Sequence, residues 1–144
     1  MDRARRVVVL AVEWNATRCA VIARVERRGE RPARLMTVEA RRDSGLRLLV
    51  GRLLLAWQAD RVHGTARVAL DLYSAPATEV RSVLEELAAA GVRPAVLYQA
   101  TPSAVGVPLG NRAGVAALRA LGAPVEAHAE LLYRMGKLAE YAQR

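Results

Sequence analysis

Apolar residues follow two different periods along this chain. From Arg6 to Glu13 they form an almost continuous run, which is typical of a central strand buried on both faces. Arg18 to Glu26 predicts a second strand, and Ala33 to Ala40 predicts a third, antiparallel and near the edge of the sheet. The charged segment 27–32 contains Gly and Pro and predicts the hairpin loop that joins them.

The period then changes to that of a helix. Apolar residues from Leu46 to Trp57 recur at i, i+3, i+4, i+7, i+8 and i+11, which is the spacing of one amphipathic face. Arg67 to Leu72 predicts a fourth strand, and helical spacing returns between Val80 and Leu87, ahead of a natural stop at Gly91. Arg93 to Tyr98 predicts a fifth strand.

The last third of the chain begins with a long connection without a period, Thr101 to Asn111, which carries two prolines and two glycines. Long connections in compact domains are often functional. Arg112 to Leu121 predicts an Ala-rich helix, and Val125 to Gln143 predicts the last helix after a break at 122–124.

The resulting order, strand-strand-strand-helix-strand-helix-strand-helix, predicts an α/β fold. Three antiparallel strands followed by right-handed β-α-β crossovers give a mixed five-stranded sheet flanked by helices, with the first strand central. A length of 144 residues suits a single domain spanning 1–144.

Charge is the first indication of a partner. The chain has 22 basic and 14 acidic residues, a net charge of +8, and its basic residues are arginines except for Lys137. The guanidinium fork suits phosphate, so the charge favours nucleic acid as a partner. A GC-rich genome, which favours Arg and Ala codons, is the alternative explanation of the same composition.

Cysteine usage and hydropathy bear on location. A lone Cys19 excludes an internal disulfide and fits a reducing, cytoplasmic compartment. The longest apolar run, Val7 to Val12, is far short of the ~20 residues of a membrane span, and it leads into Glu13 without a cleavage site. We therefore expect neither a signal peptide nor a membrane partner.

Candidate chemistry lies in carboxylates at strand ends. The sequence has no phosphate-binding loop, dinucleotide fingerprint or nucleophile elbow, and one Cys with two His does not make a structural zinc site. Glu13 ends the first strand and Asp71 ends the fourth, so in parallel register the two would meet. Such a pair suits Mg²⁺ or Mn²⁺, and two metals could clamp an in-line phosphodiester displacement. Glu126 or Glu130, on one face of the last helix, could add a third acid.

Each candidate also has a structural interpretation. Asp71 could simply turn the chain after its strand, and Glu130 with Arg134 four residues on is typical of a solvated helix face. In the long connection, Gly106 and Gly110 could bring backbone close to a phosphate or could only shape a turn.

The element order and several short segments together resemble the RNase H-like superfamily, and within it the RuvC-type Holliday junction resolvases. The segments are Val9–Asn15 with Cys19–Ile22, then Val68–Asp71, then Tyr98–Val105 with the Gly loop and helix that follow, and finally the last helix around Glu126 and Glu130. The resemblance implies metal ligation by Glu13, Asp71 and Glu130, catalysis with Glu126 as a further acid, and a possible homodimer. It implies contacts to branched or duplex DNA from Asn15, Arg18, Gly106, Gly110, Asn111 and Arg112.

The chain departs from that family at its acids. Glu13 stands where the family has Asp, Asp71 where it usually has Glu, and the Asp-Pro-Gly turn is missing. Two hypotheses therefore stay open: a metal-dependent endonuclease of DNA recombination and repair, and a non-catalytic nucleic-acid-binding or protein-interaction module. Half of an actin-like ATPase is disfavoured because no Gly-Ser/Thr phosphate turn follows Glu13.

Overall fold

The computed structural model describes residues 5–14, 19–42, 46–71, 77–97 and 110–142. Its elements, in chain order, are β1 (Arg6–Trp14), β2 (Cys19–Arg28), β3 (Arg34–Arg42), α1 (Leu46–Arg61), β4 (Thr65–Asp71), α2 (Ala77–Ala89), β5 (Ala95–Leu97), α3 (Asn111–Ala120), the 3-10 helix η2 (Val125–His128) and α4 (Ala129–Ala142).

The strands form one sheet in the order β3-β2-β1-β4-β5, with β1 in the middle. β1 pairs antiparallel with β2 and parallel with β4, and β2 pairs antiparallel with the edge strand β3. The expected α/β class, with a mixed sheet flanked by helices, is confirmed. β5 begins two residues later than the predicted 93–98, because Pro94 has no N–H to donate to the ladder and pairing with β4 starts at Ala95; residue 98 lies outside the described residues.

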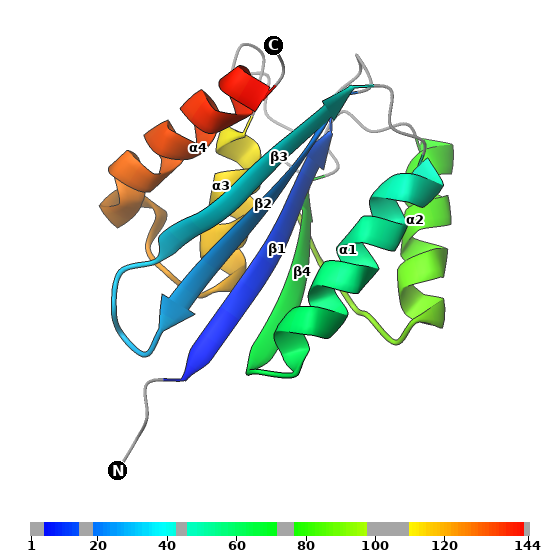
Figure 1. Cartoon of the computed structure of the whole chain (residues 1–144), viewed down its shortest axis with the longest axis horizontal. Helices are drawn as coiled ribbons and strands as arrows, with labels where there is room; N and C mark the ends of the chain where they lie inside the picture. Colours follow the sequence, from blue (N-terminus) through cyan, green and yellow to red (C-terminus); the bar gives the residue numbers. More distant parts are fainter. Residues whose placement is uncertain (1–4, 15–18, 43–45, 72–76, 98–109, 143–144) are drawn as a thin grey trace.

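Helices cover both faces of the sheet, α3 and α4 on one and α1 and α2 on the other (Figure 1). Alternation along β1 supplies both cores: Val9 and Ala11 are buried toward α3 and α4, while Leu10 and Val12 are buried toward α1 and α2. Both faces of β1 are therefore dry, as its continuous apolar run predicts.

α3 lies close to both the sheet and α4 because its buried side chains are small. Ala113, Ala116 and Ala117 have no exposed surface. A Cβ on Gly114 would come within 2.5 Å of Leu132 Cδ2, so any larger residue would force the Leu132 side chain to shift from its observed position against α3. This packing fixes where α3 begins relative to the strand ends.

Several predicted boundaries were wrong. β2 continues through Arg28, so the hairpin loop is shorter than 27–32. The last helix begins as a separate 3-10 turn, where the Ala127 N–H donates to the Pro124 carbonyl, and α4 starts only at Ala129. Asn111 belongs to α3, and residues 15–18 and most of the long connection lie outside the described residues.

Among the helices that the structure describes, none combines the length and the apolar character that crossing a membrane requires.

A candidate carboxylate site closed by arginine

The ends of β1 and β4 bring the two predicted acids together. Glu13 and Asp71 are directly paired in the parallel register. Both side chains point to the α3 face, and the residues are only 4% and 1% exposed. Two buried carboxylates so close together repel one another unless positive charge lies beside them.

Arg112 in the first turn of α3 supplies that charge to Asp71. Its Nε donates to Asp71 Oδ2 at 3.0 Å, and its Nη2 donates to Asp71 Oδ1, so the guanidinium holds both carboxylate oxygens. The Arg112 side chain is itself only 10% exposed. The pair is bidentate and buried, the geometry in which an arginine–carboxylate pair is strongest and most directional.

The N-terminus of α3 binds Glu13. Glu13 Oε1 accepts hydrogen bonds from the backbone N–H groups of Gly110, at 2.7 Å, and Ala113, at 3.0 Å. The first N–H groups of a helix have no partner within the helix, so a carboxylate from elsewhere in the chain can cap them. Gly110 makes this possible because it adopts φ 95°, a left-handed conformation that glycine tolerates.

These contacts nearly balance the charge of the site. Two carboxylates face one guanidinium and one helix N-terminus, which carries roughly half a positive charge. Burial raises the pKa of Glu13 above its ordinary value, the amides of Ala113 and Gly110 oppose that rise, and Asp71 adds to it. The structure thus accommodates both acids with groups of its own chain.

The same contacts do not fit the Mg²⁺ or Mn²⁺ that the family resemblance implies. Both oxygens of Asp71 already accept from Arg112, and Glu13 Oε1 already accepts two amides. A divalent ion would also lie beside a buried guanidinium, whose charge repels it. Within the described ranges, no group of three or more His, Cys, Asp or Glu side chains is arranged to hold a metal.

The acids predicted on the last helix are not brought to this site. Glu126 and Glu130 are both exposed. They lie on η2 and at the start of α4, at the opposite end of the sheet from the arrowheads of β1 and β4 (Figure 1). α4 then returns, so that Met135 and Ala139 lie against Gly110. The expectation placed the acids at the wrong end of the helix because it did not include the direction in which α4 runs.

The predicted DNA-contacting residues are only partly described. Asn15, Arg18 and Gly106 lie outside the described residues. Gly110 and Arg112 are buried, and Asn111 is half-buried beside Tyr133 and Lys137 of α4. The Arg112 guanidinium therefore binds Asp71. Because the Arg112 side chain is buried, it is not exposed for contact with a phosphate.

One signal in the sequence points to this role of Arg112. A cation in the first turn of a helix opposes the helix dipole, so it needs a carboxylate partner to be stable there. Arg112 is also followed by small apolar residues that bury this part of α3. A buried arginine at a helix start therefore implies an acid from elsewhere in the chain, and Asp71 is that acid.

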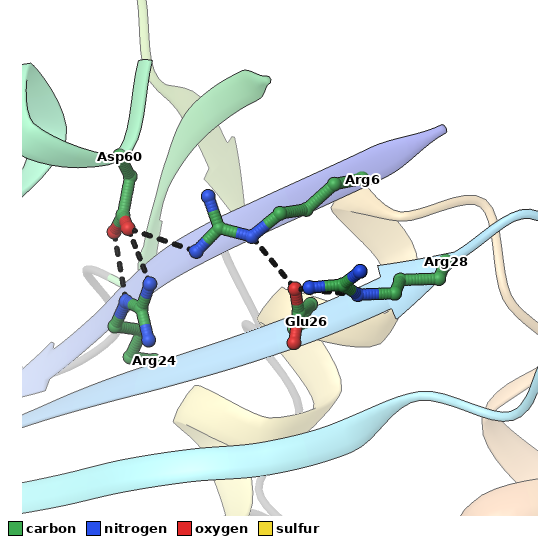
Figure 2. A network of polar contacts seen from close by, with 5 residues as sticks. All are labelled: Arg6, Arg24, Glu26, Arg28 and Asp60. Carbon is green, nitrogen blue, oxygen red and sulfur yellow. Dashed lines mark hydrogen bonds and ion pairs between the residues drawn. The ribbon is translucent and has the colours of Figure 1, made fainter. Parts of the chain in front are cut away.

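A second cluster of charges lies near the start of β1, on the α1 face (Figure 2). Arg6 Nε donates to Glu26 at 2.7 Å, and Arg24 Nε donates to Asp60 at 2.8 Å. Arg6 also reaches Asp60, and Arg28 reaches Glu26. The cluster joins β1 and β2 to the end of α1, and its three guanidinium groups outnumber its two carboxylates.

Comparison with known proteins gives distant structural likenesses. No protein-family model matches the chain, and no curated protein matches it. RuvC of Thermus thermophilus is 21% identical over 94% of this chain and 95% of that chain, with a TM-score of 0.41. RuvC of Thermus thermophilus in complex with a Holliday junction substrate is 17% identical over 94% of this chain and 96% of that chain, with a TM-score of 0.46. A Ppx/GppA family member from Aquifex aeolicus is 8% identical over 66% of this chain, with a TM-score of 0.42, and this chain spans about a third (35%) of its length.

Proposed function

We propose that this chain is a diverged RNase H-like domain, related to the RuvC-type resolvases, that binds nucleic acid and no longer cleaves it with metal ions. The order of elements and the central position of β1 support the fold assignment. Branched or duplex DNA is the proposed partner because of the net charge of +8. A homodimer belongs to the same proposal by analogy with resolvases.

One observation carries the loss of cleavage: Arg112 holds both oxygens of Asp71, beside the adjacent Glu13. A two-metal mechanism needs carboxylates that are free to bridge cations and clamp the attacking and leaving oxygens. Here a guanidinium provides the neutralising charge instead. It can bind a carboxylate but cannot activate a water for attack, since arginine stays protonated in proteins.

The test combines binding, cleavage and metal response. We expect wild-type protein to bind labelled four-way junction or duplex DNA at low salt and to leave both intact with Mg²⁺ or Mn²⁺. We also expect millimolar Mn²⁺ to leave the melting temperature unchanged, because a ligand that binds the folded state would raise it.

Cleavage would show that the endonuclease hypothesis is correct, provided that Glu13→Gln and Asp71→Asn abolish it while a surface control, Glu85→Gln, does not. Glu85 is exposed on α2 and takes no part in the carboxylate site. If wild-type protein binds no DNA even at low salt, where phosphate contacts are strongest, nucleic-acid binding itself is wrong.

A further inference from the structure

Arginines gather at the end of the sheet where β1 and β4 begin, opposite Glu13 and Asp71. Arg27 of β2 is paired in register with Val7 of β1, and Arg67 of β4 is paired with Val9. Arg67 Nη1 donates to the carbonyl of Ala120 at 2.9 Å, which places the end of α3 there as well. Six arginines define this basic end: Arg27, Arg31, Arg61, Arg67, Arg93 and Arg119. All of them are exposed except Arg27, which is half-buried.

Acidic side chains described nearby do not neutralise the basic end. Glu26 and Asp60 are buried and already paired with three other arginines in the cluster of Figure 2. Glu30 in the hairpin, Glu126 on η2 and Glu130 at the start of α4 are exposed and leave six guanidinium groups facing three carboxylates. The cluster therefore keeps two acids away from the surface.

Helix ends account for part of this charge and not for the rest. α1, α2 and α3 all end here, with Arg61 and Arg119 in the last turns of α1 and α3. Each helix C-terminus carries roughly half a negative charge, so the three helices offset about one and a half guanidinium charges. The helix C-termini therefore offset only part of the positive charge of the six arginines.

The first of two hollows at the basic end has an unsatisfied donor. It lies between the β2–β3 hairpin and the turn after α3, has a volume of about 410 Å³, and is lined in part by Arg27, Arg31 and His128. Arg27 Nε is buried and has no hydrogen-bond partner among the described residues. Buried polar groups are nearly always bonded, so this N–H is a donor available to an acceptor beyond the described residues. Phosphate oxygens match the arginine fork.

The second hollow lies on the other side of the end of α3. It has a volume of about 320 Å³ and is lined in part by Arg67, Arg93 and Trp57. The Arg61 guanidinium lies over the Trp57 ring, 4.8 Å from its centroid. Ala120 lines this hollow and Gly122 lines the first, so the two flank one turn.

We propose that the basic end is the surface through which this chain binds the phosphate backbone of nucleic acid. Arg27 and Arg31 take phosphate in one hollow, and Arg67 and Arg93 take it in the other. Two separate basic hollows fit phosphates spaced along a strand better than the continuous charge of a lipid surface. The inference rests on the proposed function, and it moves the contacts to the end of the sheet opposite Gly110 and Asn111.

The test is the affinity of a fluorescein-labelled DNA duplex, measured by anisotropy over a salt series. The variants are Arg27→Gln/Arg31→Gln and Arg67→Gln/Arg93→Gln. The control, Arg81→Gln/Lys137→Gln, removes the same charge from exposed positions on α2 and α4 away from the basic end. Each hollow variant should lose about tenfold in affinity and lower the slope of log K against log salt by about 2, because each phosphate contact contributes ~0.9. The control should lose less than about twofold.

The outcomes separate this inference from the proposed function. Equal losses in the hollow variants and the control, with wild-type protein binding, would overturn the basic end as the surface and leave the proposed function standing. Absence of wild-type binding at low salt would remove both. Binding to phosphatidylserine vesicles that DNA does not displace would instead assign the surface to lipid. Circular dichroism melts of each variant would establish that the losses do not come from unfolding.

Discussion

Glu13 and Asp71 have the same neighbours in the fold but different partners. Asp71 is held by a side chain, and Glu13 is held by the backbone of α3. The first contact fixes the position of Arg112, and the second fixes the start of the helix that carries it. The two contacts therefore support one another, and loss of either disturbs the geometry of the other.

Removing one partner of the buried pair should cost far more than the pair itself contributes. Arg112→Ala and Asp71→Ala should each lower the free energy of unfolding by about 3–5 kcal/mol, because each leaves an uncompensated buried charge. The double variant should lose much less than the sum, since it removes both charges. Urea unfolding of the four proteins measures this coupling. Additive losses would show that Arg112 and Asp71 do not interact in solution.

Glu13 predicts an unusual dependence of stability on pH. Its pKa is raised in the folded protein, so the folded state takes up this proton before the unfolded state does as pH falls. Its contribution to stability therefore increases from neutral pH toward its unfolded pKa of about 4.5. Glu13→Gln keeps an oxygen acceptor for Gly110 and Ala113 without the charge. It should be more stable than wild type at neutral pH, with an advantage that shrinks on acidification.

Urea unfolding at several pH values between about 4.5 and 7.5 tests this. Glu13→Ala is the matched variant, since it removes the acceptor as well as the charge. Loss of a buried partner for two amides should destabilise it by about 1–3 kcal/mol relative to Glu13→Gln. An advantage of Glu13→Gln that grows on acidification would contradict the raised pKa.

At the residue scale, the sequence predicted the acids but not their partner. The continuous apolar run of β1 and the short run of β4 place Glu13 and Asp71 at strand ends, and parallel pairing then brings them together. Arg112 is 41 positions from Asp71. A cation at the start of α3 indicates that Arg112 needs an acid, but which acid it meets depends on how α3 packs, and no local pattern encodes that packing.

At the element scale, the approach of α3 to α4 depends on two glycines. Gly110 has φ 95°, and a Cβ on it would lie 2.9 Å from the backbone carbonyl oxygen of Met135. A Cβ on Gly114 would meet the ends of the Leu132 and Met135 side chains, which can shift. Gly110 is therefore restricted both by its own left-handed backbone and by the backbone of Met135. Gly114 is restricted only by neighbouring side chains.

The losses of stability caused by alanine at these two positions should therefore differ, with the larger loss at Gly110. Gly110→Ala should destabilise by about 2–4 kcal/mol, from left-handed strain plus overpacking, and Gly114→Ala by about 1–3 kcal/mol from overpacking. Gly51→Ala is the control, because a Cβ there meets nothing within 4 Å in the middle of α1. It should stabilise by about 0.5–1 kcal/mol through helix propensity. Thermal melts give the order, and a Gly114→Ala loss larger than that of Gly110→Ala would contradict it.

Elements were predicted more reliably than their ends. The helical spacing of Leu46 to Trp57 correctly predicted α1, because period alone identifies an amphipathic helix. The same reasoning joined η2 to α4 as one helix over 125–143. It failed there because the tight 3-10 turn after Pro124 leaves the apolar spacing almost unchanged.

At the scale of the whole molecule, charge is divided between two ends of the sheet. At one end, the carboxylate site of Glu13 and Asp71 is buried and its charge is nearly balanced. The opposite end exposes arginine around a buried cluster that joins three elements (Figure 2). This division follows from chain direction and strand order, so composition alone predicted the total charge and not where it lies.

The cluster at that end predicts the opposite response to pH from that of Glu13. The hydrogen bond from Arg24 is the main cause that lowers the pKa of Asp60. The contribution of Asp60 to the stability of the folded state is therefore present above its unfolded pKa of about 3.8. This contribution is lost as pH falls through the lower pKa of the folded state. Asp60→Asn should be less stable than wild type at neutral pH, and the gap should close in acid. A gap that stays constant in urea unfolding down to about pH 3 would contradict the role of this ion pair.

Arg112 has a consequence for how the folded state depends on its surroundings. A carboxylate site that relies on divalent cations changes its local charge whenever those ions are scarce or chelated. Here the neutralising cation is covalently part of the chain and arrives with α3 each time the protein folds. The folded state is therefore expected to be indifferent to chelators, and its stability to be the same in magnesium-poor and magnesium-rich solution.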